Sequence, residues 1–109
     1  MTKTNLAEML LAIPGEITTA ELEVLGIEVQ LLEAKESLRR VENAVLLGGG
    51  VDGKNERVRE AQLAELTERE LTAVATLRME AMVAATQLRI LQTRLTALQA
   101  AAQLLAGPS

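Results

Sequence analysis

The residues with the clearest chemical pattern lie between Gly48 and Asn55. Gly48, Gly53 and Lys54 have the spacing of a phosphate-binding loop, but Asn55 stands where Ser or Thr would bind magnesium. Such a loop follows a buried β-strand, whereas the residues before Gly48 have a helical pattern. We therefore interpret residues 48–54 as a turn that ends a helix. An anion held by Lys54 and Asn55 at the start of the next helix remains an alternative, because free backbone N–H groups favour one there.

The composition excludes several kinds of active site. The chain of 109 residues contains no Cys, His, Phe, Trp or Tyr. It therefore has no thiol or imidazole nucleophile, no Cys/His zinc site and no aromatic platform for stacking nucleic-acid bases. We expect no enzymatic activity, no cofactor and no metal site. The one metal site left open is a cluster of four carboxylates shared between subunits, since no Glu-x-x-His pair is present.

The charged residues give a second candidate site. Acids and bases alternate along residues 56–80, which is typical of a solvated, ion-paired helix face. A basic cluster near the turn offers a contact for nucleic acid or an acidic partner: Arg39, Arg40, Lys54, Arg57 and Arg59. Acids share that region and the net charge is −4, which weakens the field on a phosphate backbone.

These residues must be positioned by helices. Over residues 4–13, approximately, the apolar side chains fall on one face of a helix. This pattern predicts a short helix, which Pro14 and Gly15 should end. Residues of about 16–47 predict a long helix, because apolar residues recur at alternating three- and four-residue intervals from Ile17 to Val45. A second apolar row lies off this seam, at Leu22, Leu25, Val29 and Leu32.

A second long helix is predicted over about 55–106, after the turn at 48–54. Its seam has two rows, Val74, Ala81, Leu88, Leu95 and Ala102, and Leu77, Ala84, Leu91, Leu98 and Leu105. Thr67 and Glu70 weaken the seam near its start. The sequence thus predicts a single all-α domain over 1–109: a long antiparallel, coiled-coil-like helical hairpin with a short N-terminal helix.

Helix lengths predict self-association. At about 1.5 Å per residue the long helices measure ~48 Å and ~75 Å. When the first helix is folded back from the turn, it therefore reaches only as far as about residue 86 of the second. The remaining Leu-rich tail needs the N-terminal helix or another subunit to cover it. We expect a homo-oligomeric helix bundle with an interface formed by Leu22, Leu25, Val29, Leu32, Leu88, Leu91, Leu95, Leu98 and Leu105.

The location of the protein is predicted from its apolar segments. No uncharged apolar run reaches the ~20 residues of a membrane span. The apolar stretch from Met9 to Ile13 is too short for a signal peptide. We expect a cytoplasmic protein with no membrane contact.

Residues 51–63, Val-Asp-Gly-Lys-Asn-Glu-Arg-Val-Arg-Glu-Ala-Gln-Leu, carry a resemblance. This segment resembles a family of small phage- and prophage-encoded helical proteins with a Gly-rich DGKN turn, and the similarity extends over about residues 16–85. Members are often encoded near single-strand annealing and replication functions. The resemblance implies that the protein acts in the cytoplasm of a bacterial host. It directs attention to Asp52, Gly53, Lys54, Asn55 and Arg59, with Arg57 beside them.

Three functional hypotheses follow. The first is a non-enzymatic phage-type accessory that binds a protein partner as an oligomeric hairpin and modulates host or phage DNA-handling or defence machinery. The second is a recombination or replication accessory that binds nucleic acid through the basic residues near the turn. The third is a protein that sequesters an anionic nucleotide between subunits through Lys54 and nearby Arg residues.

Overall fold

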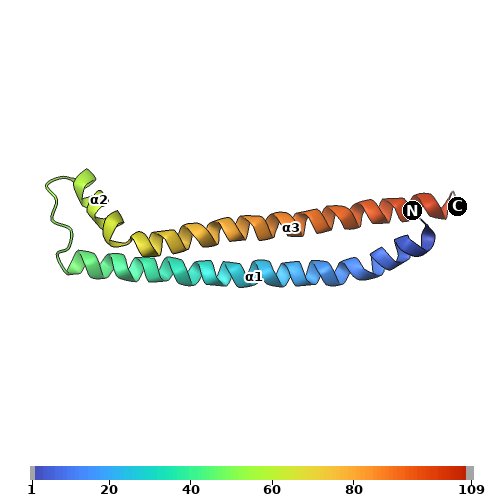
Figure 1. Cartoon of the computed structure of the whole chain (residues 1–109), viewed down its shortest axis with the longest axis horizontal. Coiled ribbons are helices and arrows are strands. Elements are labelled where there is room, and N and C mark those ends of the chain that lie inside the picture. Colours follow the sequence, from blue (N-terminus) through green and yellow to red (C-terminus); the bar gives the residue numbers. More distant parts are fainter. Residues whose placement is uncertain (1, 108–109) are drawn as a thin grey trace. The chain divides into compact units, whose positions relative to one another are not determined.

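The computed structural model describes residues 2–107, and all regular structure in that part of the chain is helical. The helices are α1 (Lys3–Leu47), α2 (Glu56–Leu66) and α3 (Glu68–Ala106) (Figure 1). The chain divides into two compact units. One joins the residues up to Gly26 with those from Met82 onward, and the other is Ile27–Ala81. The predicted helical hairpin is confirmed in its coarse form, because α1 is followed by a turn and a return through α2 and α3.

The prediction that Pro14 and Gly15 end a short helix is wrong. α1 continues through Pro14, and Gly15 has no positive φ. Proline removes one N–H, so only the carbonyl of Leu10 loses its helical partner, and the usual result is a kink. The N-terminal turns of α1 bend toward α3 in Figure 1. Leu6 and Ile13, both before Pro14, are buried, which stabilises a continuous helix.

Glycine ends α1 as predicted. Gly49 has a φ of 74°, its N–H donates to the carbonyl of Leu46, and the N–H of Gly50 donates to the carbonyl of Val45. These two bonds form a Schellman motif, which satisfies carbonyls at the end of a helix. Glycine is favoured at position 49 because a side chain would clash with the backbone at this φ.

The predicted helix over 55–106 is divided. α2 ends at Leu66 and α3 begins at Glu68, with Thr67 between them at φ −113° and ψ 17°. Figure 1 shows α2 turned away from the direction of α3. Both the N–H and the hydroxyl of Thr67 donate to the carbonyl of Leu63, at 3.0 and 2.8 Å. Thr67 is the one buried polar residue in the described part of the chain, and these bonds satisfy it at the break.

The core of the first unit lies between the two ends of the chain. Leu6, Ile13 and Leu98 are buried together, with Ile17 and Leu95 packed against them. The first turns of α1 therefore pack antiparallel to the last turns of α3. Ile17, Ala20, Val24, Ala84, Leu88 and Leu91 continue the less exposed face of the two helices. The predicted seam is confirmed in this unit.

The second unit, Ile27–Ala81, follows the same pattern. Along α1 the less exposed apolar residues are those of the predicted seam: Ile27, Leu31, Ala34, Leu38, Val41 and Val45. On α3, Val74 is buried and Leu77 is partly buried. Thr67 and Glu70 also lie on the less exposed face. The heptad spacing therefore positions the start of α3 even where its residues are polar.

Candidate functional site: the turn and two apolar surfaces

The turn before α2 is held by Gln62. Its side-chain oxygen accepts hydrogen bonds from the backbone N–H groups of Asp52 and Gly53, at 3.2 and 2.9 Å. Its side-chain nitrogen donates to the carboxylate of Asp52 at 2.9 Å. The bidentate contact fixes the loop to a residue two turns into α2. Gln62 was not among the predicted site residues, because no short-range pattern marks a contact across ten positions.

The other predicted turn residues divide into structural and exposed groups. Asn55 is the N-cap of α2, since its side-chain oxygen accepts from the N–H of Val58 at 2.9 Å. The guanidinium of Arg59 donates to the carbonyl of Gly53 at 3.2 Å. Lys54 and Arg57 are exposed. Within residues 2–107 neither side chain makes a hydrogen bond or an ion pair. Most of the DGKN motif therefore stabilises the loop.

The surroundings of the turn do not favour an anion. Asn55, Glu56, Arg57 and Glu60 line an open depression of about 530 Å³ at the start of α2. The two carboxylates oppose the single guanidinium there, and the cap of Asn55 already occupies one of the free N–H groups. Of the predicted basic cluster, Arg39 is paired with Glu36 at 3.2 Å. A phosphate group near the turn would therefore lie close to carboxylates as well as to basic side chains in the described residues.

A first apolar surface is the outer row of α1. We use this name for Leu22, Leu25, Val29 and Leu32, which are 64, 55, 46 and 66% exposed. Their spacing of three and four residues places them on one face of the helix, away from the seam. Residues of the seam in the same turns are less exposed. Leu22 and Leu25 are thus uncovered in the first unit, and Val29 and Leu32 are uncovered in the second.

The Leu-rich tail of α3 is different, because the structure shows one of the two covers expected for it, the N-terminal turns of the chain. Leu98 is 6% exposed and lies in one cluster with Leu6 and Ile13, with Leu95 packed against it. Leu88 and Leu91 are partly buried on the same seam, while Leu105 is 38% exposed. Because α1 passes through Pro14 without ending, its first turns reach this tail and cover it. Of the two expected covers, the structure therefore shows the N-terminal turns of the same chain.

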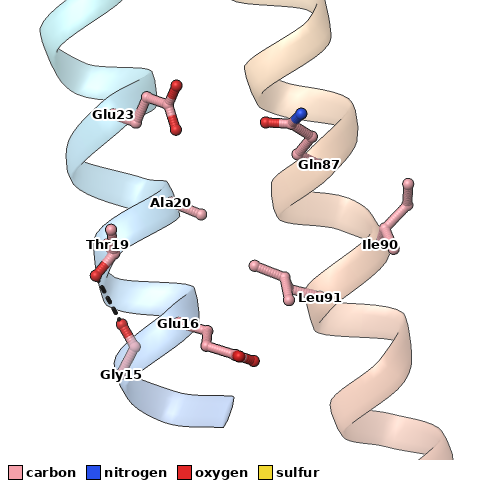
Figure 2. Close-up of a pocket in the computed structure, with 8 residues that line it drawn as sticks. All are labelled: Gly15, Glu16, Thr19, Ala20, Glu23, Gln87, Ile90 and Leu91. Atoms are coloured by element: carbon pink, nitrogen blue, oxygen red, sulfur yellow. Dashed lines mark hydrogen bonds between the residues drawn. The ribbon is translucent and has the colours of Figure 1, made fainter. Parts of the chain in front are cut away.

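A second apolar surface is a groove in the first unit, which we call the α1–α3 groove (Figure 2). It has a volume of about 610 Å³. Ala20 faces Leu91 across it, and Ile90, which is 61% exposed, borders it on α3. Gly15 leaves space on α1, since a Cβ there would meet nothing within 4 Å. Small residues on α1 opposite larger ones on α3 therefore form the hollow.

Polar side chains from both helices edge the α1–α3 groove. Glu16 and Glu23 lie on α1 in Figure 2, with Gln87 on α3. The hydroxyl of Thr19 donates to the carbonyl of Gly15 at 3.0 Å and is satisfied within the helix. Arg94 lines a smaller depression next to the groove, together with Glu16. The groove thus combines an apolar floor with two exposed carboxylates on its α1 side.

Comparison with known proteins adds no relative: no family model, no curated protein and no solved structure matches the chain. Among the helices formed by residues 3–106, none is both long and apolar enough to cross a membrane. The described residues also contain no group of three or more acids that would hold a metal ion. The candidate sites are therefore the turn, the outer row and the α1–α3 groove.

Proposed function

We propose that this chain is a non-enzymatic interaction protein that acts as an assembly of helical hairpins, with copies meeting over the outer row of α1. The observation that carries the proposal is the exposure of Leu22, Leu25, Val29 and Leu32 on one helix face. Apolar side chains that are half exposed in a single chain gain stability when a second surface removes them from water.

The spacing of the outer row supports a second copy as the occupant. Leu22 and Val29 are seven residues apart, as are Leu25 and Leu32. This is the same heptad repeat that the inner seam of α1 uses toward α3, so a helix fits the row by knobs-into-holes packing. A second copy presents an identical row, and a two-fold interface brings equal surfaces together.

The biological role follows the resemblance of the DGKN turn. The protein would serve as a phage accessory in a bacterial cytoplasm that binds and modulates host or phage DNA-handling or defence machinery. The internal hydrogen bonds of the turn support a structural role for this motif. For this reason we place the partner contact on the apolar surfaces and not on the turn.

Sedimentation velocity of the purified chain tests the assembly. We expect a mass that is a multiple of the single chain at micromolar concentrations. The double variant Leu25→Gln/Val29→Gln should shift the mass to that of one chain, because glutamine removes the apolar row and retains a good helix propensity. Its circular dichroism should stay helical.

Leu104→Gln is the matched control, because Leu104 is 83% exposed outside the outer row. It should leave the mass unchanged. A wild-type chain that sediments as a monomer at high micromolar concentration would contradict the proposal, as would an assembly unaffected by the double variant.

A further inference from the structure

We propose that the α1–α3 groove binds an amphipathic helix of a partner protein, with apolar anchors in the hollow and Lys or Arg residues over its α1 side. This inference deepens the proposed function by giving the chemistry of the partner. It uses a different set of residues from the outer row, so each proposal has its own variants.

The shape of the groove favours apolar anchor side chains. Its volume of about 610 Å³ lies within the range of cavities that hold several side chains or a small ligand. Ala20, Ile90 and Leu91 supply apolar walls. An open groove along two antiparallel helices admits a third helix, whose residues at i, i+3 or i+4 and i+7 would enter it.

The charge around the groove selects a basic partner. Glu16 and Glu23 edge it, and Figure 2 shows both on the α1 side. The sequence of α1 reinforces this sign on its own side, since residues 4–34 contain no Lys or Arg and have the acids Glu8, Glu16, Glu21, Glu23, Glu28 and Glu33, whereas the only charged residues of α3 from position 81 onward are Arg89 and Arg94. A cationic helix would pair with these exposed carboxylates and be steered to the groove, whereas an anionic lipid surface or nucleic acid would be repelled.

Arg94 on α3 sets the orientation that we expect for the partner helix. Arg94 lies on α3 beside the neighbouring depression that also contains Glu16. Within residues 2–107 no ion pair joins these two side chains. The cations of a bound helix are therefore expected over α1, away from Arg94. A partner helix with basic residues along one edge of its apolar face meets both requirements.

A synthetic peptide serves as the probe. It has about 14 residues, enough for a helix of ~21 Å, with Leu on one face, Lys on the flanking positions and one Trp. Because the protein has no Trp or Tyr, the fluorescence of the peptide reports binding without background. We expect saturable binding that weakens as salt is raised. A peptide of the same composition with scrambled order should bind at least about tenfold more weakly.

Two variants of the full-length chain locate the site. Gly15→Leu fills the groove, and the open space around Gly15 together with the better helix propensity of leucine should keep α1 folded. It should weaken binding by about tenfold or more. Gly26→Leu is its control, because Gly26 is equally open and does not line the groove. Helix content by circular dichroism should be retained in both.

Two double variants test the charge requirement. Glu16→Gln/Glu23→Gln should reduce affinity and flatten the salt dependence, while Glu8→Gln/Glu21→Gln removes the same charge elsewhere on α1 and should have little effect. Equal binding of the scrambled peptide, or equal binding by Gly15→Leu, would overturn the proposal. A fall in sedimentation mass caused by Gly15→Leu would also overturn it, since a second copy would then occupy the groove. Failure of the outer row to mediate assembly, with peptide binding intact, would affect the first proposal alone.

Discussion

At the scale of single residues, Gly53 illustrates how a turn depends on the absence of a side chain. A Cβ at this position would lie 2.6 Å from Cγ1 of Val58 and 3.1 Å from the backbone nitrogen of Arg59. Gly53→Ala must therefore shift Val58 or the loop that contacts it. We expect a loss of about 1–3 kcal/mol in the free energy of unfolding, measured by urea denaturation followed by circular dichroism.

Gly26→Ala provides the contrasting substitution. Gly26 lies inside α1, and a Cβ there would meet nothing within 4 Å. The same measurement should show a gain of about 0.5–1 kcal/mol, because alanine loses less backbone entropy in a helix. Equal effects of the two substitutions would show that the close approach at Gly53 has no energetic consequence.

The chemistry of the turn was predictable only in part at this scale. Asn55 is of a residue type that caps helices and precedes the predicted helix, and its bond to Val58 shows the cap. The two bonds from the backbone of Asp52 and Gly53 to Gln62 were not predicted, because they depend on the three-dimensional path of the loop. A turn motif in sequence identifies local caps and leaves the longer contacts open.

At the scale of helices, heptad spacing predicted which face is buried, and the glycine signals predicted the helix ends at Leu47 and Ala106. The continuity at Pro14 and the break at Thr67 were not predicted. The seam residues of α1 and α3 are the less exposed ones in each unit. The strongest local breaker, Pro14, does not end α1, because burial of Leu6 and Ile13 outweighs the loss of one hydrogen bond. Thr67, an ordinary residue by propensity, divides the return helix. Tertiary packing thus overrides the local signal at Pro14.

Packing at the paired ends of α1 and α3 leads to a test within one helix. Leu98 is 6% exposed and Leu104 is 83% exposed. Leu98→Ala should lower the free energy of unfolding by about 2–5 kcal/mol through lost burial and a residual cavity. Leu104→Ala should change it by less than about 0.5 kcal/mol in the same denaturation experiment. Similar losses for the two would contradict the assignment of Leu98 to the core.

At the scale of the whole molecule, the N-terminal turns of α1 act as the cover of the Leu-rich tail. Removal of residues 1–13 would uncover Leu95 and Leu98, which now pack with Leu6 and Ile13. We expect the truncated chain to associate more strongly than the full-length chain, with its sedimentation mass rising with concentration. Leu11→Ala in the full-length chain is the control, since Leu11 is 83% exposed. An unchanged mass after truncation would show that this tail is covered in another way.

The continuity of α1 through Pro14 also has a kinetic consequence. Proline offers no N–H, so the carbonyl of Leu10 lacks one of the bonds that couple the first turns to the rest of the helix. Opening of these turns then breaks fewer bonds than opening an uninterrupted helix of the same length. Local opening is favoured where cooperative coupling is weakest. The turns before Pro14 should therefore exchange their amide protons sooner than the turns of α1 that follow, and each opening would briefly bring Leu98 to the surface.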